Sequence, residues 1–269
     1  MKKFCITMAA AGFLASISLG QIGYSVNSNT DSHLYRIDFS TGIATDLGAL
    51  SFIDAEGISF GPSGQLFAIG GTASELWNIT SPPGSLVGGT GTRSGLDAGM
   101  DFYNGVMYNI QGSSTFSELY TINLATGAST SVGTGQFFGD NIAISSAGIG
   151  YVSDWIFSDS LYTINLATGG MTLVGGLGLG DVSVQAGSDF SAAGTLYNLT
   201  SDGQMWTIDT ATGLATFAFQ VKNAAGANLT GFEGLAIETL DSNPVPEPGT
   251  MALMGLGALA VYRKRKKSK

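Results

Sequence analysis

Apolar and polar residues alternate with a period of two in short runs along most of the chain, and this alternation is the pattern of β-strands. The clearest run covers 161–166, where Tyr162, Ile164 and Leu166 alternate with polar residues. A glycine follows at 169, and glycine adopts the positive φ that a tight turn requires without steric cost. The segment therefore predicts a strand followed by the turn of a hairpin.

The same hairpin pattern recurs along the chain. It is repeated almost verbatim at 119–127, more loosely at 34–42 and 205–213, and in a degenerate form from Leu76. The first residues of successive copies lie 42 to 44 residues apart. Because a period of about 40–45 residues is typical of four-stranded propeller blades, the spacing predicts a repeat protein.

A second pattern lies between successive hairpins and consists of an apolar strand, a glycine turn and another strand. In the segment 56–69 the turn is Gly61-Pro62-Ser63-Gly64, and equivalent segments begin near 98, 140 and 187. Together with the hairpin, this pattern gives four strands in each repeat.

The fifth copy is split between the two ends of the chain. The segment 233–238 has the sequence of an inner strand with no partner after it, whereas 23–26 and the hairpin from Leu34 have no inner strand before them. Pairing the two ends closes a ring and removes open sheet edges. We therefore expect an all-β, five-bladed propeller over 21–241, closed by pairing of the C-terminal inner strand with the N-terminal blade, with a longer rim loop at 220–231.

The first twenty residues have the features of a secretory signal peptide. Two lysines precede an apolar run at 4–19, and the small residue Gly20 follows it. We expect 1–20 to form a signal helix that is removed after Gly20. The only cysteine, Cys5, lies inside this segment, so the mature chain can form no disulfide bond, which fits bacterial export.

The C-terminal end forms a separate module in three parts. We predict a linker at 242–249, a short transmembrane helix at 250–262 and a basic cytoplasmic tail at 263–269. Thirteen residues at ~1.5 Å each span about 20 Å, less than the ~30 Å of a bilayer core, so the membrane must thin locally. The basic residues that flank the membrane are Arg263, Lys264, Arg265, Lys266 and Lys267.

This tail resembles a PEP-CTERM sorting signal in the order, spacing and terminal position of its parts. The resemblance implies a bacterial host that produces exopolysaccharide and has an exosortase, a membrane transpeptidase that recognises Pro246, Glu247 and Pro248. The chain would be anchored in the membrane transiently and then reach the cell surface or the extracellular space. A permanent C-terminal membrane anchor is the alternative.

The repeated hairpin resembles the blades of many secreted propellers, including the NHL, YVTN and quinoprotein-like types. The matching residues are structural, so this resemblance implies a fold and no reaction.

Charge and composition exclude several classes of function. The stretch 21–241 carries three basic and nineteen acidic residues, a net charge of −16, which repels phosphate backbones and excludes nucleic acid as a partner. The single histidine, His33, excludes histidine-based zinc or copper sites, and together with Asp31 and Ser32 it indicates an exposed turn, not a catalytic triad. No glycine-rich phosphate loop followed by lysine occurs, and a quinone or nucleotide cofactor would need cationic groups, of which 21–241 has only three, so we expect neither cofactor.

Three carboxylates occupy one column of the inner-strand pattern: Glu56, Asp140 and Glu233. They would converge at one mouth of a central channel. They could form a solvated acidic rim, bind Ca²⁺ through several oxygen ligands, or act as the acid and base of a glycosidase. Calcium is the one metal that this pattern suggests.

Aromatic residues divide into two groups. One aromatic per blade shares a face with an isoleucine two residues later, which indicates core between blades: Tyr35, Trp77, Tyr120, Tyr162 and Trp206. A second group on less repetitive loops would form exposed sugar-stacking platforms in a lectin: Phe137, Phe138, Trp155 and Phe157.

Taken together, the sequence favours an exported, non-enzymatic binding or structural propeller that contacts extracellular polysaccharide or surface proteins. The alternative is a polysaccharide-active glycoside hydrolase, or a lectin, that uses the inner-strand carboxylates.

Overall fold

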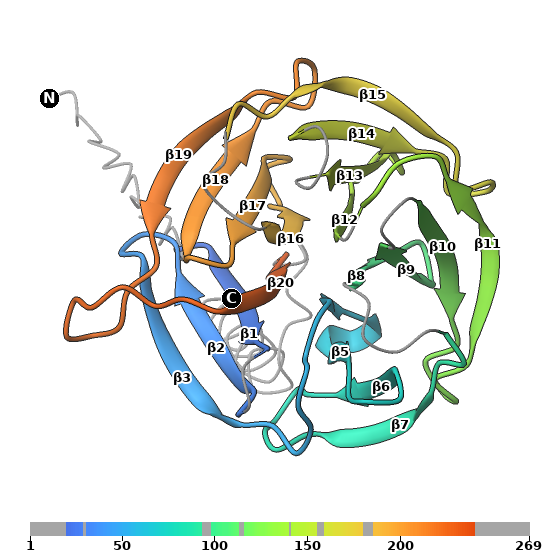
Figure 1. The fold of residues 1–269 in the computed structure, drawn as a ribbon. Helices are drawn as coiled ribbons and strands as arrows, with labels where there is room; N and C mark the ends of the chain where they lie inside the picture. The colour runs from blue at the N-terminus through green and yellow to red at the C-terminus, as the bar shows by residue number, and fades with distance from the viewer. Residues whose placement is uncertain are drawn as a thin grey trace, which may run out of the picture.

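In a computed structural model, the chain forms five four-stranded antiparallel sheets arranged as blades around a central axis (Figure 1). The structure describes residues 20–28, 31–92, 98–112, 116–139, 141–154, 159–179 and 185–239. The expected all-β, five-bladed propeller is confirmed.

The strands run from the axis outward in each blade, and one 3-10 turn, η1 (Pro62–Gly64), joins two of them. The first blade contains β20 (Phe232–Ile237), β1 (Ile22–Asn27), β2 (His33–Asp38) and β3 (Ile43–Ala49). The second contains β4 (Ile58–Phe60), β5 (Leu66–Gly70), β6 (Glu75–Asn78) and β7 (Ser85–Gly89). The third contains β8 (Ala98–Tyr103), β9 (Val106–Gly112), β10 (Ser117–Ile122) and β11 (Ser129–Gly135). The fourth contains β12 (Asn141–Ile144), β13 (Gly150–Asp154), β14 (Ser160–Ile164) and β15 (Met171–Gly176). The fifth contains β16 (Gln185–Phe190), β17 (Leu196–Thr200), β18 (Gln204–Ile208) and β19 (Ala215–Gln220).

The two ends of the ring meet in the first blade, as expected. β20 pairs antiparallel with β1, so that Tyr24 lies opposite Ala236. The hydroxyl of Ser25 donates to the carbonyl oxygen of Gly234 at 2.7 Å, and Ser25 is fully buried. The C-terminal strand therefore supplies the innermost strand of a blade that begins at the N-terminus.

The repeated Asn or Asp before each hairpin glycine stabilises the turn. In the fourth blade, Oδ1 of Asn165 accepts the N–H of Ala167 at 2.9 Å, while its carbonyl accepts the N–H of Gly169 at 2.8 Å. Gly169 has a φ of +73°, which glycine adopts without strain. Asp38, Asn123 and Asp209 form equivalent turns. These side chains hold the turns, and this explains why they recur.

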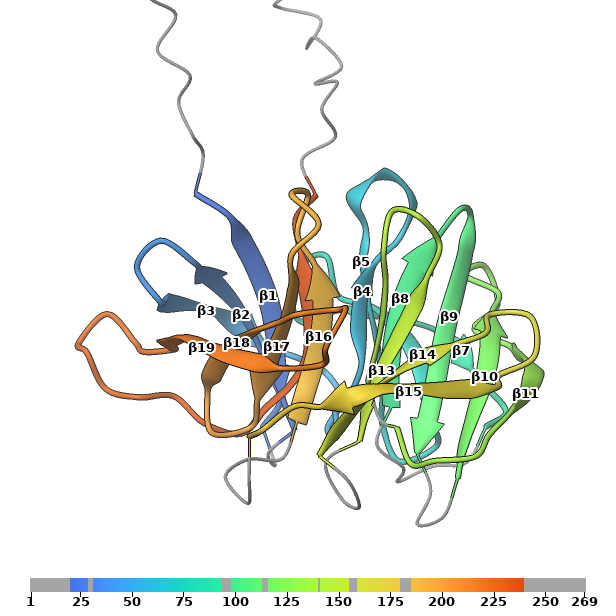
Figure 2. The same cartoon turned by 90° about the horizontal axis from the view of Figure 1, so that it is seen from above.

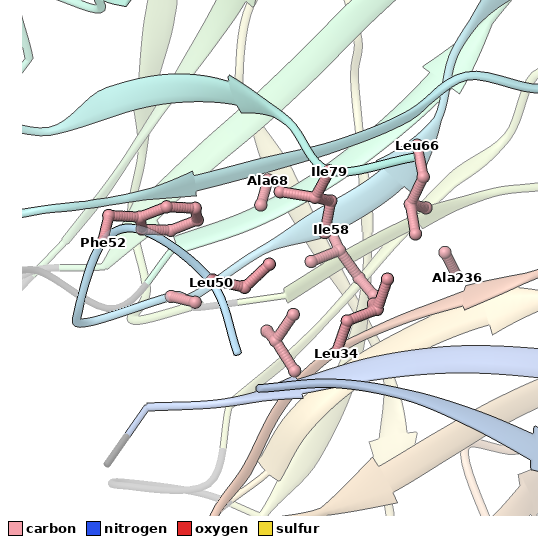
Figure 3. Close-up of a cluster of buried hydrophobic side chains, with 10 residues drawn as sticks. Leu34, Leu50, Phe52, Ile58, Leu66, Ala68, Ile79 and Ala236 are labelled. Carbon is pink, nitrogen blue, oxygen red and sulfur yellow. The ribbon is translucent and has the colours of Figure 1, made fainter. Parts of the chain in front are cut away.

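The hydrophobic core lies mainly between neighbouring blades. Figure 3 shows one cluster, in which Leu34 of the first blade packs with Ile58 and Ile79 of the second. Trp77 of the same cluster stacks on Phe52 with ring centroids 4.5 Å apart. The other clusters contain Tyr35 with Ile37, Tyr162 with Ile164, and Trp206 with Ile208. The prediction that these aromatic and isoleucine residues form the core between blades is therefore confirmed in four of the five repeats.

Glycines bring the inner strands into backbone contact around the axis. A Cβ atom on Gly99 would lie 2.4 Å from the Cα of Asn141 in the next blade, and one on Gly187 would lie 2.3 Å from the N of Leu235. Gly57 and Gly234 are equally close to neighbouring backbone. A cavity of only about 10 Å³ lies between the inner strands at this level. The inner strands therefore pack closely around the axis.

Several predicted features lie outside the described residues, namely the signal segment before residue 20, the linker, the apolar segment 250–262 and the basic tail. Within the described ranges, no helix is long and apolar enough to cross a membrane. Figure 2 shows that the start of β1 and the end of β20 lie on the same side of the molecule as the turns that follow β4 and β16.

Candidate functional site: a cavity at one mouth of the ring

A cavity of about 630 Å³ lies at the mouth where the five inner strands end. Every blade contributes to its wall, because each inner strand runs toward this face before the chain turns back. Its lining residues include aromatic and hydroxyl side chains, namely Ser59, Phe60, Phe102, Tyr103, Ser145, Ser146, Tyr151, Phe190, Ser191, Thr210 and Thr239. The wall therefore combines apolar rings with hydrogen-bonding groups.

Asp101 lies in this wall and is 8% exposed. The backbone N–H of Phe102, its neighbour on β8, donates to Oδ1 at 2.6 Å. The N–H of Ile144, at the end of β12 in the next blade, donates to Oδ2 at 2.5 Å. The hydroxyl of Ser59 lies 3.5 Å from Oδ1. One carboxylate thus joins two blades at the edge of the cavity.

Asp189 repeats this arrangement in the fifth blade. The N–H of Phe190 donates to its Oδ1 at 2.6 Å, and the N–H of Ile237, on the ring-closing strand β20, donates to its Oδ2 at 2.6 Å. Asp189 also lines the cavity and is half-buried. The two aspartates therefore hold equivalent positions in two blades and face one cavity.

Burial raises the pKa values of both carboxyl groups. It raises the pKa of Asp101 to about 7, because the loss of hydration outweighs the N–H donors of Ile144 and Phe102, which act in the opposite direction. Burial, followed by the charge of Asp101, raises the pKa of Asp189 well above its ordinary value. Because the charge of Asp101 disfavours the charge of Asp189, the two carboxyl groups in this cavity resist full ionisation.

Sequence reasoning missed this pair, although a signal was present. Both aspartates precede a phenylalanine, in Asp101-Phe102 and Asp189-Phe190, at the same position of the repeat. The equivalent residues of the other blades are Ser59, Ala143 and Ala236. Two carboxylates in one repeat column, two blades apart, were sufficient to predict a shared mouth.

Two of the predicted carboxylates, Glu56 and Glu233, lie near the start of the inner strands, away from this cavity. Glu56 precedes β4 instead of lying within it, and Glu233 lies in β20, where the hydroxyl of Ser28 donates to it at 3.3 Å. The structure brings their backbones together, since a Cβ on Gly234 would lie 2.6 Å from the carbonyl oxygen of Glu56. Asp140 lies outside the described residues. Convergence of all three, and calcium binding by them, stays a prediction.

In the described ranges, no three His, Cys, Asp or Glu residues gather in a group that could hold a metal ion. The one histidine lies in β2, not in a turn as expected. Its Nδ1 pairs with Oδ2 of Asp46 at 2.9 Å in a partly exposed ion pair. The adjacent Ser32 is buried, whereas the side chain of His33 is 30% exposed. Ser32 and His33 therefore occupy different environments and form no nucleophile–base pair.

The expected group of loop aromatics is only partly exposed. Phe137 is 39% exposed and stacks on Tyr162 with ring centroids 4.6 Å apart. Phe138 is buried, so the expectation that it is exposed was wrong. A Cβ on Gly112 would lie 2.7 Å from the Phe138 ring, which shows that this glycine leaves room for it. Trp155 and Phe157 lie outside the described residues.

A second cavity of about 480 Å³ lies beside the first. It is lined by Gln21, Arg36, Asp38, Ser40 and Glu238, together with Ala192, which also lines the first cavity. The hydroxyl of Tyr24 donates to Oε1 of Glu238 at 2.8 Å. The two cavities therefore adjoin at the turn between β16 and β17.

Several solved structures are similar to this chain. A chain of a nidogen/laminin complex matches with 12% identity over 81% of this chain and 81% of that chain, at a TM-score of 0.54. TolB from Acinetobacter baumannii matches with 13% identity over 81% of this chain and 66% of that chain, at a TM-score of 0.48. A protein of unknown function from Bacteroides caccae matches with 11% identity over 77% of this chain and 74% of that chain, at a TM-score of 0.46. No curated protein matches the chain in sequence. At this identity the likeness shows the fold alone.

The C-terminal segment gives a more specific match. Residues 244–266 match the family described as the PEP-CTERM protein-sorting motif, and they include Pro246, Glu247 and Pro248. This motif implies export and processing by an exosortase at the membrane. The chain is therefore a five-bladed β-propeller that carries a PEP-CTERM sorting motif at its C-terminal end.

Proposed function

We propose that this chain is a non-enzymatic binding propeller that holds extracellular polysaccharide at the cell surface or in the extracellular matrix after an exosortase has processed its tail. The motif at 244–266 supports export and processing. The ligand-binding part of the proposal rests on the cavity at the mouth of the ring.

The cavity is the single observation that carries the binding role. Its volume of about 630 Å³ lies within the range of about 300–1,000 Å³ typical of ligand sites. Hydroxyls such as those of Ser145 and Ser146 can bond to sugar hydroxyls, and rings such as Phe60 can pack against the apolar faces of sugars. This combination suits a neutral, hydroxyl-rich polymer better than an apolar ligand.

The position of the tail fits this role. Thr239, the last described residue before the sorting motif, lines the cavity. The described chain therefore ends at the face that would bind the polymer.

Binding and sorting can be tested separately. The processed protein, purified from its host, should co-sediment with the host's extracellular polysaccharide, and failure to do so would reject the binding role. Cells that express the full-length chain should contain its processed form in the surface or matrix fraction, and a chain that lacks 244–269 should be lost from that fraction. An unchanged distribution would reject sorting by the tail.

A glycoside hydrolase is the second candidate, because the pKa of Asp101, about 7, suits a general acid. The geometry favours a structural role, since the oxygens of Asp101 and Asp189 accept backbone N–H groups from two blades. We expect no release of reducing ends from the bound polymer. Turnover that disappears in Asp101→Asn, Glu56→Gln or Glu233→Gln would favour the hydrolase instead.

A further inference from the structure

The first residues of the described chain lie where the ring closes. Gln21 directly precedes β1, and its carbonyl oxygen accepts the N–H of Phe39 at 3.0 Å. One residue later, the carbonyl oxygen of Ile22 accepts the N–H of Glu238, which follows the ring-closing strand β20, at 2.9 Å. Residues 21 and 22 therefore connect the start of the first blade to the segments that follow β2 and β20.

Gln21 contributes only its carbonyl oxygen to these contacts. Its backbone N–H takes part in no hydrogen bond in the described part of the chain. Its side-chain nitrogen is buried and has no acceptor among the described residues. Because a buried donor without an acceptor is costly, the fold is destabilised by the presence of this nitrogen.

The predicted cleavage of the signal peptide makes Gln21 a terminal residue. Cleavage after Gly20 leaves Gln21 at the start of the exported chain, with a free α-amine. The amine and the side-chain amide then belong to one residue and can react with each other through a five-membered ring, as a fast intramolecular step. α-Amino groups titrate at about pH 8, so part of the amine is uncharged and nucleophilic at neutral pH.

We propose that Gln21 is a modification site, at which the exported chain closes its first residue into a pyroglutamate lactam. The nitrogen of the α-amine attacks Cδ of the side chain, so that an N–Cδ bond forms and the Cδ–Nε2 bond breaks. Nε2 leaves as ammonia and takes up the proton that the α-amine loses, so the step needs no co-reactant. The inference rests on cleavage after Gly20 and is independent of the proposed polysaccharide role.

The contacts of Gln21 are compatible with the lactam. The reaction removes the nitrogen that the fold buries without an acceptor among the described residues. The ring contains N and Cδ, so the main-chain carbonyl oxygen stays free to accept the N–H of Phe39. Gly20 and Gln21 both line the second cavity, of about 480 Å³, and removal of Gly20 enlarges the space beside the ring. Ring closure takes place in the newly released chain, before folding encloses the side chain.

A lactam at this position protects the closure of the propeller. Aminopeptidases act on a free α-amine, which the lactam lacks. Trimming of residues 21 and 22 would remove the acceptors for Phe39 and Glu238, and the next residue, Gly23, already pairs with β20. The modification therefore suits an exported chain whose only cysteine, Cys5, lies in the signal segment, so that no disulfide bond holds its ends.

Mass spectrometry of the N-terminal peptide of the processed protein, purified from its host, tests the inference. We expect a peptide that begins at residue 21 and is lighter than its sequence by the mass of one ammonia. A peptide that begins at residue 21 with an intact glutamine would overturn the inference. A peptide that begins at another residue would overturn it too, whereas co-sedimentation decides the polysaccharide role separately.

Two controls make the result specific. A synthetic peptide of residues 21–26, added at cell lysis, measures ring closure during purification, and a lactam fraction in the protein no greater than in this peptide would overturn the inference. The matched variant is Gln21→Asn, because asparagine would have to close a four-membered ring. Its terminal peptide should keep a free α-amine and its full mass. Loss of ammonia from the variant as well would place the reaction at another residue and contradict the assignment to Gln21.

Discussion

Asp189 accepts the backbone N–H of Ile237 at 2.6 Å, and this hydrogen bond joins the fifth blade to the strand that closes the ring. Asp101 accepts the N–H of Ile144 in the same way, between the third and fourth blades. Two aspartates therefore connect neighbouring blades at the mouth where the main cavity lies. Any titration of these groups acts on both the stability of the ring and the charge of the cavity.

Stability should decrease as pH rises through neutrality. The folded pKa of Asp101, about 7, exceeds its unfolded value near 3.8, so between these values the folded state binds more protons. The stabilisation that protonation contributes is complete below the unfolded pKa and is lost as pH rises through about 7, with a slope of at most about 1.4 kcal/mol per pH unit for one group. Urea unfolding at a series of pH values from 5 to 8 measures this slope.

The same measurement on Asp101→Asn separates this group from the general acidity of the chain. The variant cannot titrate at this position, so its curve should be flatter than that of the parent. The exposed residue Asp31 provides the matched control, and Asp31→Asn should leave the slope close to that of the parent. Parallel curves for the parent and Asp101→Asn would contradict the titration assigned to this carboxyl group.

The glycine contacts around the axis predict a sharp difference between two glycines near the third blade. A Cβ on Gly99 would lie 2.4 Å from backbone, whereas a Cβ on Gly89 would meet nothing within 4 Å. Gly99→Ala should therefore lower the free energy of unfolding by about 1–3 kcal/mol through overpacking, and Gly89→Ala should change it little. Equal effects in thermal or urea unfolding would show that the inner strands are not in backbone contact.

Two leucines on neighbouring strands of the fourth blade test the core between blades. Leu161 in β14 is 1% exposed, and Leu173 in β15 is 58% exposed. Leu161→Ala should cost about 2–5 kcal/mol because it leaves a cavity. Leu173→Ala should cost far less, since that side chain is largely in water already. A comparable loss in the two variants would place the core elsewhere.

The sorting motif predicts a processing defect. Replacement of Pro246, Glu247 and Pro248 by alanine removes the residues for which the motif is named, so the full-length precursor should accumulate in the membrane fraction. Immunoblots of whole cells and of the membrane fraction measure its size and location. Ser242→Ala lies outside the matched residues 244–266 and should be processed normally. Normal processing of the triple alanine variant would show that the exosortase does not recognise the motif in this chain.

The architecture could be predicted from the sequence because local patterns determine it. The spacing of the hairpins predicted the number of blades. The unpaired inner-strand sequence near 233 predicted that the ring closes by pairing of β20 with β1. The repeated aspartate or asparagine predicted the turns because its hydrogen bonds lie within a few residues.

The shared repeat position of Asp101 and Asp189 was readable from the sequence, but their hydrogen bonds were not, because these join residues of different blades. Asp101 meets Ile144 across 43 residues, and Asp189 meets Ile237 across 48. Such pairs follow only from the stagger of adjoining inner strands, which the repeat pattern does not contain. Phe138 was predicted to be exposed for a related reason, since the space beside Gly112 that receives its ring is visible only in the fold.

A blocked cavity tests the central claim most directly. Ser146 is an exposed residue of the cavity wall, so Ser146→Trp would fill the mouth and leave the contacts of both aspartates unchanged. The measurement is co-sedimentation of the processed protein with the host's extracellular polysaccharide, for the parent and for this variant. We predict that the parent binds and that Ser146→Trp, folded to the same melting temperature, loses most of this binding. Undiminished binding by the variant would contradict the assignment of the cavity as the polymer site.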